Sequence, residues 1–142
     1  KSERRDRDGV WRPFDFDQTH IFTGSFIYQF RRHHWELGTT LRLITGNPYT
    51  PVVGSVFDPV AQAHYPINGV TNSARVDMFF RLDLRVEKQW WFDSWKLALF
   101  LDVQNATNRS NPETVLYNYD FTEVQGFPGL PILPVVGLDA SF

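Results

Sequence analysis

The sequence predicts an all-β fold, an antiparallel meander of five long strands. Five runs of the chain alternate apolar and polar residues with a period of two, as half-exposed strands do, while helical periodicity is weak throughout. The connections between these runs alternate short, long, short and long. Because strands joined by a tight turn are antiparallel neighbours, we expect each run to pair with the next.

The first two runs cover residues 19–30 and 35–46, with the polar residues 31–34 between them. Alternate residues of a strand point to opposite sides of a sheet, so each run has one apolar face. The apolar residues are Phe22, Phe26, Tyr28 and Phe30 in the first run and Leu37, Leu41 and Leu43 in the second.

The third run, residues 79–92, alternates most clearly. Four apolar residues from Phe80 to Val86 alternate with charged residues. In a helix, Arg81 and Arg85 would be a like-charged pair at i,i+4, which destabilises helices, so we predict a strand. Asp93 and Ser94 form a turn into the fourth run, residues 95–105, and the fifth run covers residues 131–142.

Two stretches between the runs, residues 47–78 and 106–130, are rich in proline, glycine and polar residues and are expected to be irregular loops. The opening KSERRDRDG has neither a helix cap nor apolar periodicity. We therefore expect the chain to have been cut out of a longer protein.

The five runs are suited to crossing a membrane. They are about 11–14 residues long, close to the roughly 9–11 of a tilted transmembrane strand and longer than the 5–6 typical of soluble strands. Aromatic residues flank the two short turns and end the chain, as in the girdle at the membrane interface of a β-barrel. The predicted periplasmic girdle is Phe30, Trp35, Trp90, Trp95 and Phe142, with Trp91 and Phe92 beside it.

Five strands are too few to close a barrel, since outer-membrane barrels start at about eight strands. An open sheet in lipid would leave the hydrogen-bonding groups of its edges unpaired, at a cost of several kcal/mol each. The expected sheet therefore needs neighbouring strands from outside this sequence.

Several segments in this order resemble the C-terminal end of TonB-dependent outer-membrane receptors. They are LRLITGNPYTPV (41–52), NSARVDMFFRLDLRVEKQW (72–90), WKLALFLDVQNATNRSNPE (95–113), YNYDF (117–121) and GLPILPVVGLDASF (129–142). The resemblance implies a 22-stranded barrel in the outer membrane of a Gram-negative bacterium, with these runs as its last five strands. Residues 1–18 would then end an extracellular loop or a preceding strand.

The same resemblance implies function and partners. Such receptors import scarce nutrients, such as iron chelates, cobalamin or oligosaccharides, driven by the proton gradient of the inner membrane. The implied partners are the N-terminal barrel strands and plug of the same receptor, TonB bound through the N-terminus, and outer-membrane lipid. This segment alone would not be active.

The final strand is similar to the terminal strands of outer-membrane barrels. Gly137, Ala140 and Phe142 match the glycine, apolar and aromatic positions of that pattern, while Val135 occupies its polar position. The similarity implies that this strand docks on the β-barrel assembly machinery by edge-strand addition. The alternative is a strand that simply happens to end in phenylalanine.

Two sets of residues are candidates for contacts inside the barrel. The polar row of the third and fourth runs is expected to line the lumen, either as a plain polar wall or as a path for substrate or ions. Tyrosines of the long loops are candidates for a ligand-binding rim, the alternatives being an outer girdle or packing within the loops. The row is Arg81, Asp83, Arg85, Glu87 and Asp102, and the tyrosines are Tyr49, Tyr65, Tyr117 and Tyr119.

Other classes of function find little support in the sequence. The absence of cysteine excludes disulfides and thiolate metal sites, and a net charge of −2 argues against a general nucleic-acid binder. We expect no enzyme and no cofactor, since no GxSxG, HExxH or phosphate-binding glycine loop occurs and Ser25, Ser55 and Ser110 have no adjoining histidine.

Metal sites and glycosylation are not expected either. His33 and His34 point to opposite faces of a strand, and His20 differs in parity from Asp15 and Asp17. The acceptor motifs for glycosylation at Asn105 and Asn108 are short enough to occur by chance. Two alternatives to a receptor remain open: a passive structural or adhesive barrel, and a soluble β-module that binds carbohydrate or single-stranded nucleic acid.

Overall fold

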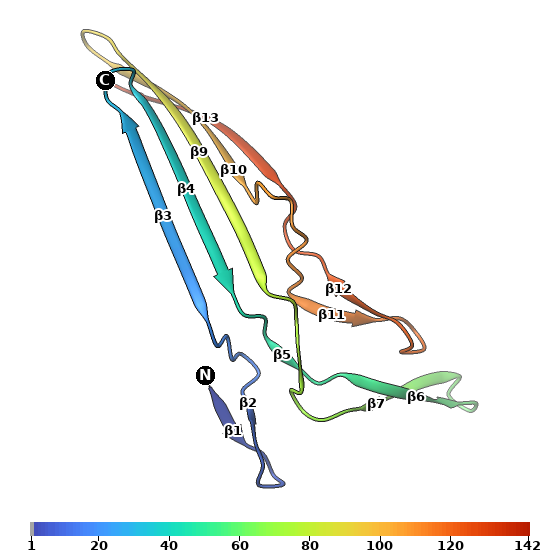
Figure 1. Cartoon of the computed structure of the whole chain (residues 1–142). Coiled ribbons are helices and arrows are strands. Elements are labelled where there is room, and N and C mark those ends of the chain that lie inside the picture. The colour runs from blue at the N-terminus through green and yellow to red at the C-terminus, as the bar shows by residue number, and fades with distance from the viewer. Residues whose placement is uncertain (1) are drawn as a thin grey trace. The chain divides into compact units, whose positions relative to one another are not determined.

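The computed structural model describes residues 2–142, and within that range it contains β-strands and their connections but no helix (Figure 1). The described residues thus include no long apolar helix that could span a membrane. The predicted all-β, antiparallel class is confirmed. The chain divides into two compact units, one of residues 2–21, 44–79 and 111–129 and the other of residues 22–43, 80–110 and 130–142.

The second unit is built on a five-stranded sheet with the strand order β13-β10-β9-β4-β3, so each strand pairs with the next long strand of the chain. This is the meander that the alternating connections predict. The strands are β3 (Ile21–Phe30), β4 (Trp35–Ile44), β9 (Phe79–Trp91), β10 (Lys96–Gln104) and β13 (Leu133–Ser141).

The register of the sheet separates an apolar face from a polar one. Across β9 and β10, Val86 lies opposite Leu101 and Arg85 lies opposite Asp102. Across β10 and β13, Leu99 lies opposite Leu138. A shift of one residue would move every apolar side chain to the other face, so the alternation of the sequence excludes registers shifted by one residue.

The apolar face of the sheet is largely exposed. Val136 and Leu138 retain 69% and 70% of their accessible surface, and the apolar residues of β3 are exposed as well. Among the described residues, only Val76 and Ala98 are buried apolar residues. A globular protein of this length normally buries most of its large aliphatic side chains in one core, which this chain does not.

Both tight turns of the sheet and the C-terminus lie at the same end of the five strands (Figure 1). The turn between β9 and β10 is closed by a hydrogen bond of 2.9 Å from the Phe92 amide to the Trp95 carbonyl. The two long connections leave the sheet at its other end, because the strands alternate in direction.

The stretches expected to be irregular instead contain short antiparallel hairpins, so that expectation is wrong in part. Proline and glycine mark their turns and edges: Pro66 lies within β7 opposite Ser55, and a bulge follows Val52. A two-stranded hairpin has free edges on which a residue without an N–H is tolerated. In these stretches β6 (Val52–Asp58) forms a hairpin with β7 (Ala63–Asn68), β11 (Thr114–Tyr117) forms one with β12 (Val124–Phe127), and β5 (Pro48–Tyr49) pairs with β8 (Ala74–Arg75) on either side of β6 and β7 in the chain. A further hairpin, of β1 (Glu3–Arg5) and β2 (Trp11–Pro13), lies within residues 2–18.

Candidate functional site

The polar face of the sheet holds the charged row that the alternation of β9 predicts. Arg81 Nε donates to both carboxylate oxygens of Asp83 at 2.7 and 2.9 Å. Arg85 donates to Glu87 at 2.8 Å and lies 3.7 Å from the carboxylate of Asp102 on β10. The row is therefore a set of paired charges, in which each carboxylate has a guanidinium partner.

A shallow depression of about 300 Å³ lies on this face, between β3, β4, β9 and β10. Ser25 and Thr40 are hydrogen-bonded across β3 and β4 at 3.1 Å, so their side chains share the polar face. The depression is lined by polar and charged side chains, among them Ser25, Glu36, Thr40, Arg42, Arg81, Asp83, Arg85, Asp102 and Gln104. This arrangement suits a hydrated wall and offers hydrogen-bond donors and acceptors to a polar solute.

One aromatic ring is embedded in the polar face. The guanidinium of Arg85 lies 4.2 Å from the centroid of the Phe100 ring, a cation–π contact. On the other side of the ring is Gly137, the ladder partner of Phe100. A Cβ atom on Gly137 would lie 2.2 Å from Phe100 Cζ, so the ring occupies the space that a side chain would need.

Asn105 organises the turn that follows β10. Its side chain is buried and donates to the carbonyls of Arg109 and Leu130, at 2.9 and 2.8 Å. Its backbone N–H donates to Asp83 at 2.9 Å, and its φ of 49° is in the left-handed region that asparagine tolerates. Asn108 accepts from the Ile132 amide at 3.0 Å. The two asparagines thus join the turn to the start of β13, a structural role that leaves the Asn105 amide no freedom to carry a glycan.

The predicted girdle residues lie at the end of the sheet that holds the tight turns. Trp95 stacks on Phe92 with ring centroids 4.4 Å apart and on Phe142 at 6.1 Å. Trp90 pairs with Leu97 on the apolar face, whereas Trp91 pairs with Lys96 on the polar face. Trp91 therefore shares the level of the girdle but lies on the opposite face of the sheet.

The three residues of the terminal-strand pattern have different surroundings. Gly137 is on the polar face beneath Phe100, and Ala140 is on the apolar face opposite Leu97. Phe142 lies beyond the end of β13 and is 97% exposed. Packing against Phe100 thus accounts for the glycine, while little in the described structure constrains Phe142.

The tyrosines of the long connections pack in the first unit. The Tyr117 hydroxyl oxygen accepts a hydrogen bond of 3.0 Å from the Val52 amide of β6, and the Tyr119 hydroxyl donates to the Gln62 carbonyl at 2.6 Å. Tyr65 is exposed on β7, and Tyr49 lies on β5. Two of the four candidate rim tyrosines are therefore held in contacts between hairpins.

Ser55 lies close to a histidine that is distant from it in the sequence. Its Oγ lies 3.3 Å from His64 Nδ1, the two residues being on the paired strands β6 and β7. The expectation that Ser55 lacks a nearby histidine is thus wrong. The hydroxyl also donates to the Asp120 carbonyl at 2.6 Å, and the His64 ring packs against Phe57 and Tyr119. These contacts tie the hairpins together.

Asp17 is the buried centre of a second polar network. Arg75 donates to its carboxylate at 2.6 Å and to its backbone carbonyl at 2.7 Å. The Arg75 guanidinium, with hydrogen bonds from the Ser2 amide and the Thr19 hydroxyl, holds the pKa of the Asp17 carboxyl well below its usual range. Asp17 therefore stays ionised as a structural group.

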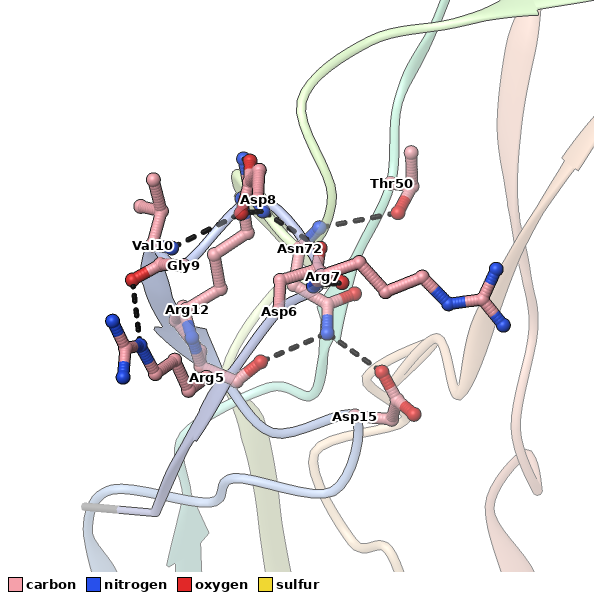
Figure 2. Close-up of polar contacts among 11 residues, drawn as sticks. Arg5, Asp6, Arg7, Asp8, Gly9, Val10, Arg12, Asp15, Thr50 and Asn72 are labelled. Carbon is pink, nitrogen blue, oxygen red and sulfur yellow. Dashed lines mark hydrogen bonds and ion pairs between the residues drawn. The ribbon is translucent and has the colours of Figure 1, made fainter.

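The N-terminal hairpin carries further paired charges (Figure 2). Arg12 binds Asp6 and Asp8 at 2.6 Å each, and it lowers the pKa of the Asp8 carboxyl. Asn72 donates to the Pro13 carbonyl at 2.9 Å and to Asp15 at 2.6 Å, as Figure 2 shows for Asp15. Within residues 2–142, no group of three His, Cys, Asp or Glu side chains has the arrangement of a metal site.

The chain was also compared with known proteins. No protein-family model, no curated protein and no solved structure matched it.

Proposed function

We propose that this chain is the C-terminal part of the barrel wall of a TonB-dependent outer-membrane receptor, which imports a scarce nutrient such as an iron chelate, cobalamin or an oligosaccharide. The observation that carries the proposal is the five-stranded meander with one exposed apolar face and one polar face. In a barrel, the first would contact lipid and the second would line the lumen.

The position of the aromatic residues supports the same proposal. Rings gather at the end of the sheet that holds its tight turns, and short turns are typical of the periplasmic side of outer-membrane barrels. The free edges of β3 and β13 fit further strands of a larger barrel, since unpaired edges in lipid are costly. The segment motifs in 41–142 supply the resemblance to the receptor family.

Cell fractionation of the full-length protein tests the proposal. We expect the protein in the outer-membrane fraction. Deletion of its gene should abolish the uptake of one nutrient, and in the wild type that uptake should stop when the proton gradient is dissipated. Outer-membrane location with uptake unaffected by the gradient would point to a passive barrel. Recovery in a membrane-free fraction would contradict the proposal altogether.

A further inference from the structure

Lys88 is a charged residue on the apolar face of the sheet. It is two residues from both Val86 and Trp90 along β9, and its ladder partner on β10 is Leu99, so it lies on the same, apolar face as these residues. Every other charged residue of the five strands falls at a position of the polar face. A charge on a face that contacts lipid is tolerated only near the interface, where the ammonium reaches polar groups.

The surroundings of Lys88 place its ammonium at the β3–β4 turn. Lys88 Nζ lies 5.4 Å from the centroid of Trp35 and 5.9 Å from that of Trp90, and it donates to the His33 carbonyl. An ammonium held between two interfacial indoles is at the level of lipid phosphates.

The same turn carries two more cations. Arg31 and Arg32 are exposed, and neither forms an ion pair with a described residue. The nearest acidic side chain in the sequence, Glu36, accepts a hydrogen bond of 2.7 Å from Gln29 on the polar face. On that face Glu36 lines a depression together with Arg31, which leaves Arg32 and Lys88 as the cations of this end for a phosphate group to complement.

An apolar depression adjoins this cationic turn. It has a volume of about 380 Å³ and is lined by Phe30, His33, Trp35, Leu37 and Val86. His33 and Trp35 also contact Lys88, so the depression begins where the ammonium lies. Its nearly apolar lining suits a hydrocarbon chain more than a polar solute.

We propose that the β3–β4 turn, Lys88 and this depression form a binding site for an anionic phospholipid, whose phosphate lies between Arg32 and Lys88 and whose acyl chain lies over Leu37 and Val86. The inference rests on the proposed function, because it needs the apolar face to contact lipid. The short turns face the periplasm in that function, so the lipid belongs to the inner leaflet of the outer membrane.

Native mass spectrometry of the full-length protein, purified in detergent and mixed with equal amounts of phosphatidylglycerol and phosphatidylethanolamine, tests the site. We expect preferential retention of phosphatidylglycerol, reduced about fivefold for each charge removed by Lys88→Gln or Arg32→Gln. Lys88→Arg keeps the charge and should keep the preference. Leu37→Trp, which fills the depression without changing charge, should lower the retention of both lipids.

Lys96→Gln is the matched control. Lys96 lies over Trp91 at 4.9 Å at the same end of the sheet, but on the polar face. Its removal should leave lipid retention unchanged. A protein that is folded in the outer membrane but retains both phospholipids equally, or loses its preference equally with Lys96→Gln, would overturn the site and leave the proposed function intact. A protein absent from the outer membrane would instead overturn the function on which the site rests.

Discussion

Arg85 shows how a single residue shapes the polar face. Its guanidinium contacts Glu87 on its own strand, Asp102 on β10 and the ring of Phe100. Paired in this way, the charged row is satisfied within the sheet. This favours the interpretation of the row as a polar wall over its interpretation as a set of unpaired charges that binds an ion.

The assignment of the two faces predicts that an added charge destabilises the protein much more on the apolar face than on the polar face. Leu84→Arg places a guanidinium on the apolar face and should cost about 2–4 kcal/mol if the residue lies near the bilayer midplane. Gln104→Arg, next to Val103, the ladder partner of Leu84, places the same charge on the polar face and should cost far less. Urea unfolding of both variants in lipid vesicles measures the difference.

Gln104 is a better control site than Asp83, because Asp83 accepts hydrogen bonds from Arg81 and from the Asn105 amide. A change at Asp83 would therefore disturb the turn after β10 as well as the charge. Equal losses of unfolding free energy in Leu84→Arg and Gln104→Arg would mean that the faces are assigned wrongly.

The Phe100 ring predicts a specific coupling with Gly137. Gly137→Ala forces the new methyl group against the ring and should destabilise the sheet by about 1–3 kcal/mol, as overpacking does. Phe100→Ala removes the obstacle, so the double variant should lose less stability than the sum of the single variants. Additive losses in such a double-mutant cycle would show that the glycine is needed for a reason other than this contact.

At the level of elements, the Asp17 network predicts a dependence of local stability on pH. The folded-state pKa of Asp17 is depressed, so the stabilisation that it contributes is complete above the unfolded pKa of about 3.9 and is lost as the pH falls towards the folded value. Hydrogen exchange at β8 should therefore lose protection between about pH 5 and pH 3 in the wild type.

Asp17→Asn is the reference for this measurement, since it removes the titrating group and leaves the neighbouring carboxylates in place. The variant should show weaker protection at pH 5 and a smaller change on acidification. If its pH dependence matched that of the wild type, the Arg75 contact would not be the source of the acid sensitivity.

The long strands could be predicted from the sequence, whereas the hairpins between them could not. The runs at 79–92 and 95–105 alternate over many residues, which leaves a single face for their leucines. The strands β5 and β8 have two residues each, and β6 contains a bulge, so no period can be read from them.

The candidate site was predictable to a similar extent. The charged row of β9 follows directly from alternation, and so does its place on the same face as Asp102. The contact of Ser55 with His64 and that of Phe100 with Gly137 depend on the register between strands, which one sequence does not determine. The sequence does contain the signal for Lys88, because the alternation of its strand places it on the same face as the leucines.

For the whole molecule, the terminal aromatic predicts a separation of assembly from stability. Phe142 is almost fully exposed and touches Trp95 alone among the aromatic rings described, so it should contribute at most about 1–3 kcal/mol. If the strand docks on the assembly machinery, deletion of Phe142 should reduce the amount of receptor in the outer membrane far more than it lowers the melting temperature.

Trp90→Ala is the control for this deletion. It removes a larger girdle ring but leaves the terminal pattern unchanged. An unchanged yield after deletion of Phe142, or an equal fall in yield with Trp90→Ala, would make Phe142 an ordinary girdle residue.

The central claim is that the two faces of one sheet contact lipid and water respectively, and spin labels along β13 measure this directly. Single cysteines carrying a nitroxide are placed at Val135, Val136, Leu138 and Asp139 in the full-length protein in lipid vesicles, a scan helped by the absence of cysteine from this chain. We expect oxygen, which is concentrated in lipid, to collide most with labels at Val136 and Leu138. A water-soluble nickel complex should collide most with labels at Val135 and Asp139. Equal access of the nickel complex to both sets would contradict the account.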